Sequence, residues 1–409
     1  MQRTRFKFSV LCTVLSIVLT LAGILAPAVA QPCEWASGLN FPGMNNTVWA
    51  LTVFDDGRGP ALYAGGFFTS AGGVAVNRIA KWDGTQWSAL GSGMNSTVWA
   101  LTVFDDGTGP ALYAGGQFTT AGGVAANRIA RWDGTRWMAF SSGMNGPVLT
   151  LTVLDDGSGP ALYAGGQFTR AGGVAANRIA RWDGTQWSAF GSGTNGPVLA
   201  MAVFDDGSGS ALYAGGSFMI AGSVVANRIA KWDGAQWSAF GSGMNGPVLA
   251  LAIFDDGGGP LLYAGGDFTS ASDVEANRIA RWDGTQWLTF DNGMNNAVLA
   301  LVGYDDGNGP ALYAGGDFTI AGDVEANRIA RWDGTQWSAL GSGIDNSVWV
   351  LTEYDDGGGP ALYAGGVFTT AGDNPSPFIA AWRCAMTEMK AAMRLSTTSR
   401  DAGNESYIE

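Results

Sequence analysis

The stretch GMNSTVWALTVFDDGTGPALYAGGQFTTAGGVAANRIARWDGTRWMAFSS, residues 93–142, decides the fold because the chain repeats it. Copies of this 50-residue unit follow one another without insertion or deletion. They begin at Gly43, Gly93, Gly143, Gly193, Gly243, Gly293 and Gly343. A period in this range is typical of stacked supersecondary units such as solenoid repeats or propeller blades.

Each unit predicts four short antiparallel strands. In the second copy we expect them at residues 98–104, 111–118, 128–132 and 136–140, with a hairpin turn at residues 105–110 and a loop at residues 119–127. The strands are apolar on both faces, as a sheet packed between two neighbouring sheets requires. The sequence therefore predicts an all-β, seven-bladed β-propeller of four-stranded antiparallel blades.

The two ends of the chain differ from the repeats. Arg3, Arg5 and Lys7 precede an apolar stretch at residues 8–25 and a small-residue Ala28-Val29-Ala30 site. This pattern predicts a signal peptide over residues 1–30 and a secreted, cell-surface or periplasmic protein, with a retained membrane anchor as the alternative. The propeller is expected over residues 31–384. Residues 385–409 form a tail, either a short helix packed on the ring or a disordered segment.

The seventh unit contains only three strands, ending at Cys384. Residues 33–39 resemble the missing fourth strand, so Trp35 is expected to take the part that Trp337 plays in the sixth unit, and Trp382 the part of Trp332. Cys33 and Cys384 then lie where the other units have an Asp-Gly turn, and we predict a disulfide between them. Free or intermolecular thiols are the alternative.

Two repeated features have structural interpretations with functional alternatives. Of the 17 tryptophans, 14 flank the last hairpin of a unit as pairs such as Trp132 and Trp137; we expect them to pack between blades, with sugar stacking as the alternative. The pair Gly65-Gly66 and its copies predict a close approach of strands or a bulge. A phosphate cradle is the alternative there.

The motifs LYAGGxF and NRIARWDGTxWSALGSG carry a resemblance to known families. The chain resembles the kelch-type repeat, and more closely the repeats of secreted bacterial surface proteins and of the fungal cortical-marker family, over residues 33–384. The resemblance implies a propeller used for display and binding. The Asp-Gly-Thr-x-Trp segment is similar to the Asp-box of sialidases, but Arg or Lys precedes it in place of Ser or Thr, so we infer no glycosidase activity from it.

Composition limits the chemistry. Histidine is absent, which excludes Ser-His-Asp and Cys-His arrangements and imidazole metal sites. The formal charge of −13 argues against nucleic acid as a partner. The Asp-Asp-Gly turns, such as Asp55-Asp56 and Asp255-Asp256, lack the alternating spacing of calcium loops and are interpreted as capped turns.

The repeats differ most in the loop between the second and third strands, where the later units become acidic. Asp291 and Asp345, in the loops that enter the first strands, should share the same face of the ring. We expect an acidic arc that binds a divalent cation or a basic partner, with neutral drift on an exposed loop as the alternative. Its residues are Asp267, Asp273, Glu275, Asp317, Asp323, Glu325 and Asp373.

The sequence thus favours a non-catalytic secreted or surface-displayed binding scaffold. We expect a monomer without a cofactor, calcium remaining the alternative, and a protein or glycan partner. A second hypothesis is a carbohydrate-active enzyme that uses Asp317 with Asp323, or Asp267 with Asp273, as acid and base. A structural protein without a specific ligand is the third.

Overall fold

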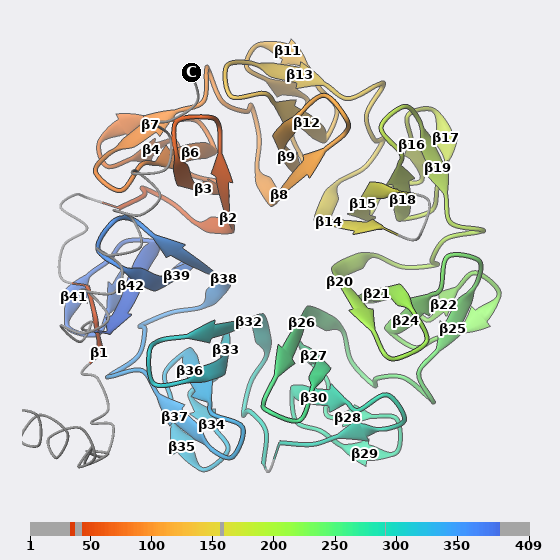
Figure 1. Ribbon diagram of the computed structural model, residues 1–409, viewed down its shortest axis with the longest axis vertical. Coiled ribbons are helices and arrows are strands. Elements are labelled where there is room, and N and C mark those ends of the chain that lie inside the picture. The colour runs from red at the N-terminus through yellow and green to blue at the C-terminus, as the bar shows by residue number, and fades with distance from the viewer. Residues whose placement is uncertain (1–32, 37–42, 156–158, 291, 385–409) are drawn as a thin grey trace, which may run out of the picture.

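Seven four-stranded antiparallel sheets surround a central axis in the computed structural model (Figure 1). The structure describes residues 33–36, 43–155, 159–290 and 292–384. In this part of the chain every regular element is a strand, and no helix could span a membrane. The predicted fold class is therefore confirmed. The expected signal peptide and C-terminal tail lie outside the described residues.

The first strand of each blade is innermost and the fourth lies toward the rim (Figure 1). Blade 1 contains β2 (Val48–Asp55), β3 (Pro60–Gly66), β6 (Ile79–Trp82) and β7 (Trp87–Ala89). Blade 2 contains β8 (Val98–Asp105), β9 (Pro110–Gly116), β12 (Ile129–Trp132) and β13 (Trp137–Ala139). Blade 3 contains β14 (Val148–Asp155), β15 (Pro160–Gly166), β18 (Ile179–Trp182) and β19 (Trp187–Ala189). Blade 4 contains β20 (Val198–Asp205), β21 (Ser210–Gly216), β24 (Ile229–Trp232) and β25 (Trp237–Ala239). Blade 5 contains β26 (Val248–Asp255), β27 (Pro260–Gly266), β30 (Ile279–Trp282) and β31 (Trp287–Leu288). Blade 6 contains β32 (Val298–Asp305), β33 (Pro310–Gly316), β36 (Ile329–Trp332) and β37 (Trp337–Ala339). Blade 7 contains β38 (Val348–Asp355), β39 (Pro360–Gly366), β42 (Ile379–Cys384) and β1 (Cys33–Trp35).

The segment between the second and third strands is not the loop that the sequence predicted. It forms a two-stranded ribbon in every blade, because an asparagine or aspartate from the preceding loop pins its start. In blade 2, Asn95 Oδ1 accepts hydrogen bonds from the backbone N–H groups of Thr119 and Thr120, at 2.8 and 3.0 Å. The ribbons are β4 (Ser70–Ala71) with β5 (Val74–Ala75), β10 (Thr120–Ala121) with β11 (Val124–Ala125), β16 (Arg170–Ala171) with β17 (Val174–Ala175), β22 (Ile220–Ala221) with β23 (Val224–Val225), β28 (Ser270–Ala271) with β29 (Val274–Glu275), β34 (Ile320–Ala321) with β35 (Val324–Glu325), and β40 (Thr370–Ala371) with β41 (Asn374–Pro375).

The N-terminal strand completes blade 7, as predicted. Trp35 pairs with Trp382 in the antiparallel register, and their ring centroids lie 5.3 Å apart. The indole Nε1–H of Trp35 donates to Leu340 O of blade 6 at 3.1 Å. Cys33 and Cys384 are joined by a disulfide across a sequence separation of 351 residues. The ring is therefore closed by backbone pairing, aromatic packing and a covalent bond.

The core lies between blades, which explains why both faces of the strands are apolar. One buried cluster combines Phe54 and Tyr63 of blade 1 with Leu112 and Phe118 of blade 2. The tryptophans of the last hairpin pack in the same interfaces; Trp132 and Trp137 are 7% and 3% exposed, with ring centroids 5.3 Å apart. This confirms packing, rather than sugar stacking, as the role of this pair.

The double glycines allow close contact between neighbouring strands. A Cβ atom on Gly65 would lie 2.6 Å from Val98 Cγ1 of the next blade, and one on Gly66 would lie 2.1 Å from Thr47 O. The register between β2 and β3 shifts opposite these glycines. Both the close approach and the bulge that the sequence predicted are present.

Candidate functional site

The Asp-Asp-Gly turns use their carboxylates to build the fold. Asp255 Oδ1 accepts hydrogen bonds from the N–H groups of Gly257 and Gly259, at 2.8 and 2.9 Å. Both glycines have positive φ, 102° and 106°. The prediction of capped turns is therefore confirmed for this turn.

The second aspartate of the turn holds a cation from the third strand. Asp56 Oδ2 lies 2.6 Å from Lys81 Nζ and accepts the Tyr63 hydroxyl at 3.2 Å. Burial opposes ionisation of Asp56, but Lys81 and Tyr63 outweigh it, so the pKa of this carboxyl lies below its usual value. These turn carboxylates are thus committed to ion pairs and hydrogen bonds within their blades.

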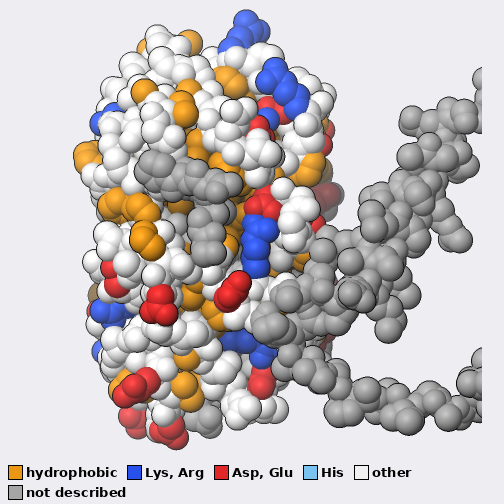
Figure 2. Space-filling view, turned by 90° about the vertical axis from the view of Figure 1, so that its left-hand side faces the viewer, with side chains coloured by type: hydrophobic (Ala, Val, Ile, Leu, Met, Phe, Trp, Pro, Cys, Tyr) orange, Lys and Arg blue, Asp and Glu red, His pale blue; other side chains and the backbone are white. Residues whose placement is uncertain are grey.

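The residues of the predicted acidic arc occupy two kinds of position. Asp267 and Asp317 follow the last residues of β27 and β33, whereas Asp273, Asp323 and Asp373 lie in the turns of the ribbons. Glu275 and Glu325 are the last residues of β29 and β35. The ribbons β28/β29 and β34/β35 lie at the outer rim (Figure 1). Figure 2 shows acidic side chains gathered at the lower end of the view, the side on which blade 6 lies in Figure 1.

Some of these carboxylates are occupied by neighbours. Asp267 Oδ1 lies 3.3 Å from Arg278 Nε, and Asp323 Oδ1 accepts a hydrogen bond from Asn292 Nδ2 at 2.7 Å. The hydroxyl of Ser347 donates to Asp317 Oδ1. The members of each pair considered for acid and base catalysis therefore come from different elements and have different surroundings.

The rim carboxylates form no ion pair with the part of the chain that the structure describes. Asp273, Glu275, Asp323 and Glu325 are exposed. Within the described residues, none of these four lies within 4.0 Å of a Lys or Arg nitrogen. We name these four residues the acidic rim. On two adjacent blades it carries negative charge that no described Lys or Arg compensates.

The structure does not place Asp345 as a free carboxylate on this face. Its Oδ1 accepts the N–H groups of Thr369 and Thr370 at 2.9 and 3.1 Å, and Oδ2 accepts the Thr369 hydroxyl at 2.6 Å. Asp345 thus performs the pinning role that Asn95 performs in blade 2. Asp291 lies outside the described residues.

The arc does not form a metal-ligand cluster in the described part of the chain. The one group of three ligand atoms within 4.8 Å of one another there consists of Cys33, Asp306 and Cys384. The two cysteines are joined in the disulfide, so their sulfurs are not thiolate ligands. The carboxylates of the arc are spread along the rim rather than gathered around one point.

Two pockets lie near blades 5 to 7. A pocket of about 320 Å³ lies next to the arc, but its lining contains no carboxylate: Thr269, Asn277, Arg278, Asn292, Gly293, Met294, Asn295, Ile320 and Gly322. A second, open pocket of about 540 Å³ lies at the opposite ends of the first strands, toward the axis. Its lining consists of Ile253, Phe254, Asp255, Gly257, Gly303, Tyr304, Asp305, Pro310 and Glu353.

This second pocket was not predicted from the sequence, although the repeats contain its signal. At one position of the first strand, blades 1 to 5 have Val53, Val103, Val153, Val203 and Ile253. Blades 6 and 7 have Gly303 and Glu353 at the same position. A comparison of the strands, rather than of the loops alone, would have identified both residues.

Comparisons with known proteins agree on the architecture. The sequence profile described as the Rax2 C-terminal beta propeller domain matches residues 152–296. No curated protein matches the chain. Among solved structures, the chain is similar to the extracellular domain of the putative one component system BT4673 from B. thetaiotaomicron, with a TM-score of 0.54 and 13% identity over 85% of this chain and 39% of that one. The extracellular domain of the putative hybrid two component system BT4673 from the same organism gives a TM-score of 0.51 and 13% identity, over 87% of this chain and 40% of that one. The chain therefore spans about two fifths of the length of these structures, and at this identity the likeness concerns the fold. Together with the seven sheets, these matches place the chain among β-propeller repeat proteins.

Proposed function

We propose that the protein is a secreted or cell-surface, non-catalytic β-propeller that binds a basic protein partner through the acidic rim. The observation that carries the proposal is the uncompensated charge of Asp273, Glu275, Asp323 and Glu325 on two exposed ribbons. The corresponding ribbon position in blades 1 to 3 is Ala75, Ala125 and Ala175. A change from alanine to glutamate in two adjacent blades concentrates charge where a partner can reach it.

A basic surface fits the acidic rim better than a single metal ion does. Calcium requires six to eight oxygen ligands around one point, whereas these carboxylates are distributed over two ribbons. Exposed carboxylates of one sign attract a complementary surface and speed its association, with a strength that decreases as salt increases. Asp267, Asp317 and Asp373 add charge near the acidic rim, although Asp267 is partly neutralised by Arg278.

The ribbon of blade 4, the neighbour of blade 5, favours a protein over a glycan as the partner. Three exposed side chains in or directly before this ribbon are large and apolar: Met219 is 50% exposed, Ile220 39% and Val225 65%. The equivalent residues of blade 1 are Thr69, Ser70 and Ala75. Exposed apolar groups beside charged ones are typical of protein interaction surfaces.

The location of the protein outside the cytoplasm is supported by three observations. The similar solved structures are extracellular domains, the chain contains a disulfide, and its repeats resemble those of secreted bacterial surface proteins and of the fungal cortical-marker family. Expression of the full chain with fractionation of cells and medium tests this part of the proposal. Retention of the protein in the cytoplasm would contradict it.

A charge-transposition experiment tests the acidic rim. The wild-type protein is screened on arrays of extracellular proteins and glycans, at low and high salt, beside two variants. The first restores the repeat with Glu275→Ala and Glu325→Ala. The second combines these changes with Ala75→Glu and Ala125→Glu, so that the net charge is kept and the charge is moved to blades 1 and 2. We expect proteins with basic surfaces to bind the wild type in a salt-sensitive manner and to lose binding to both variants.

The two variants distinguish binding at the acidic rim from binding that depends only on the net charge of the protein. If the transposed variant binds as well as the wild type, net charge alone determines binding and the acidic rim is not the site. If uncharged glycans bind and both variants retain them, the proposed partner class is wrong.

A further inference from the structure

The pocket at the axial ends of blades 5, 6 and 7 differs from the acidic rim in position and in chemistry. It lies beside the Asp-Asp-Gly turns, as its lining residues Asp255, Gly257 and Asp305 show, whereas the ribbons follow the opposite ends of the second strands. Its volume of about 540 Å³ is within the range of small-molecule sites. It therefore needs its own explanation.

The pocket exists because two blades depart from the repeat. In blade 5, Ile253 packs against the buried cluster that blades 4 and 5 share, so this position faces the preceding blade. In blade 6 the position is Gly303, and a Cβ atom there would lie 3.0 Å from Phe254 Cδ2 of blade 5. Blade 6 thus lacks the aliphatic side chain of this position, although the Phe254 ring stays buried at 7% exposed. The wall next to the glycine is apolar and is formed by Ile253 and the small exposed part of Phe254.

In blade 7 the same position introduces a charge. Glu353 is exposed and lines the pocket together with Tyr304 of blade 6. The Tyr304 hydroxyl is already used, since it donates to Pro360 O at 2.9 Å. Burial, followed by the negative charge of Glu353, raises the pKa of the Tyr304 phenol, which agrees with a carboxylate close to the ring.

The turn carboxylates strengthen the negative potential of the pocket. Asp255 and Asp305 each use Oδ1 to cap their own turn, at 2.8 to 3.1 Å from glycine N–H groups. Among the described residues that line the pocket there is no Lys or Arg. The carboxylates of the pocket thus lie beside an apolar wall formed by Ile253, Phe254 and Tyr304.

We propose that this pocket binds an organic cation, an alkylammonium group whose charge pairs with Glu353 and whose carbon chain lies against Ile253, Phe254 and the Gly303 backbone. The charge of the exposed Glu353 attracts an ammonium group, and the adjoining apolar wall accommodates its carbon chain. A bare metal ion is a poorer fit because one wall of the pocket is apolar and offers no oxygen ligand. The ammonium group could belong to a free amine or to a lysine side chain of another protein.

Calorimetric titration of the full chain tests the site with three probes. These are n-butylammonium, N-acetyl-lysine methylamide, and n-butanol as the neutral analogue. We expect the two cations to bind and n-butanol to bind at least about tenfold more weakly. Tighter binding of the lysine amide identifies a protein side chain as the source, and tighter binding of butylammonium identifies a free amine. Absence of binding by both cations, or equal binding of n-butanol, overturns the proposal.

Three variants assign the binding to the two exceptional residues. Glu353→Val restores the residue of blades 1 to 4 and should weaken cation binding about tenfold or more. Gly303→Val fills the pocket and should abolish it, with Gly303→Ala as a milder variant in case the larger side chain disturbs folding. Glu275→Ala on the acidic rim is the matched control and should leave binding unchanged. Binding that survives Glu353→Val undiminished overturns the assignment, and because the probes bind away from the acidic rim, this outcome leaves the partner surface unaffected.

Discussion

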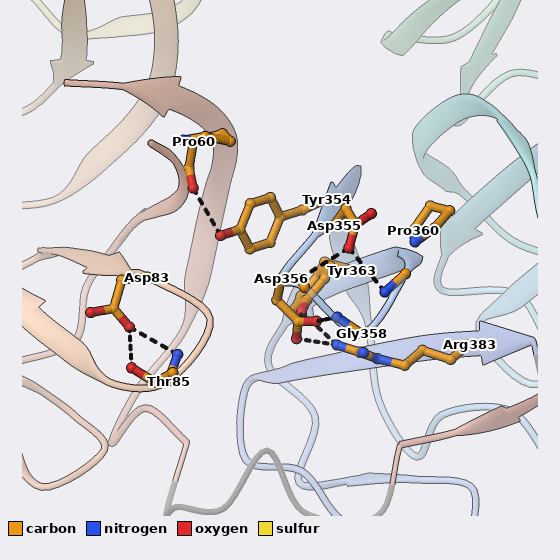
Figure 3. Close-up of polar contacts among 12 residues, drawn as sticks. Pro60, Asp83, Thr85, Tyr354, Asp355, Asp356, Gly358, Pro360, Tyr363 and Arg383 are labelled. Carbon is orange, nitrogen blue, oxygen red and sulfur yellow. Dashed lines mark hydrogen bonds and ion pairs between the residues drawn. The ribbon is translucent and has the colours of Figure 1, made fainter. Parts of the chain in front are cut away.

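Arg383 of blade 7 forms an ion pair with Asp356 (Figure 3). In other blades the residue that supplies this cation lies two positions earlier in the third strand. In blade 6, Arg331 stands opposite Tyr313 in the strand register and lies 3.4 Å from Asp306. In blade 7, Ala381 stands opposite Tyr363. Arg383 replaces the missing cation and also donates to the Tyr363 hydroxyl at 3.1 Å. Blade 7 thus keeps the ion pair of the other blades, with the arginine at a different position of the strand.

Replacement of Arg383 should destabilise the ring closure. Arg383→Ala leaves Asp356 bonded to Tyr363 and to the Gly358 N–H but removes its only cation among the described residues. Since the Asp356 side chain is 9% exposed, we expect a loss of about 1–3 kcal/mol in the free energy of unfolding, measured by urea denaturation. Addition of Ala381→Arg, which returns the cation to the register of the other blades, should recover most of this loss. An unchanged unfolding midpoint for the single variant would show that the pair contributes nothing.

The disulfide should stabilise the protein chiefly by restricting the unfolded chain. Because Cys33 and Cys384 are 351 residues apart, the chain-entropy relation gives about 6 kcal/mol. Reductant should therefore lower the denaturation midpoint of the wild type but not that of a Cys33→Ser/Cys384→Ser variant. Hydrogen exchange should accelerate first in β1 and β42. If reduction changes neither measurement, the strand pairing and Trp35 alone hold the ring closed.

The double glycines should tolerate no side chain. A Cβ atom on Gly265 would lie 2.5 Å from Val298 Cγ1 of the next blade, so Gly265→Ala should cost about 1–3 kcal/mol in thermal or chemical denaturation. Gly258 is the matched control: a Cβ atom there would meet only Asp256 Oδ1 at 3.5 Å, and blades 1 and 2 carry Arg58 and Thr108 at this position. Gly258→Ser should stay within about 0.5 kcal/mol of the wild type. Equal effects of the two substitutions would contradict the close-approach explanation.

The repeat period and the unfinished seventh unit were sufficient to predict the blades and the joining of Cys33 with Cys384. The blades depend on a pattern within one unit that seven copies repeat, and the disulfide follows when the two ends of the chain are compared with a complete unit. The ribbons were missed because Ala121, Gly122 and Gly123 show no strand alternation. Their pairing instead depends on Asn95, 24 or 25 residues earlier in the chain.

The candidate sites were predicted less well, for a related reason. Charge can be read from the sequence, but the partner that occupies a carboxylate cannot. Asp345 and Glu275 look equivalent as acidic substitutions and both are exposed, yet the Asp345 carboxylate accepts three hydrogen bonds from Thr369 and Thr370. The axial pocket arises from a side chain that Gly303 lacks, and such an empty volume becomes visible only when neighbouring blades are packed together.

The buried tyrosines predict a stability limit at high pH. Burial, and next the charge of Asp256, raises the pKa of Tyr263 to about 12; Tyr63, Tyr113, Tyr213, Tyr313 and Tyr363 shift in the same direction, with burial as the largest cause. Because the folded pKa lies above the value of about 10 in the unfolded chain, this contribution to stability is complete below pH 10 and is lost as pH rises through the folded pKa values.

Ultraviolet absorbance of the phenolate should therefore stay low in the native protein at about pH 11 and be nearly complete at that pH in guanidinium. Ionisation of the native protein should coincide with loss of near-ultraviolet circular dichroism. Tyr263→Phe removes one of these hydroxyls. It should therefore reduce the absorbance change that accompanies unfolding, without adding an absorbance change near pH 10. Gradual native-state titration near pH 10 with the fold retained would show that these phenols are not buried against their aspartates.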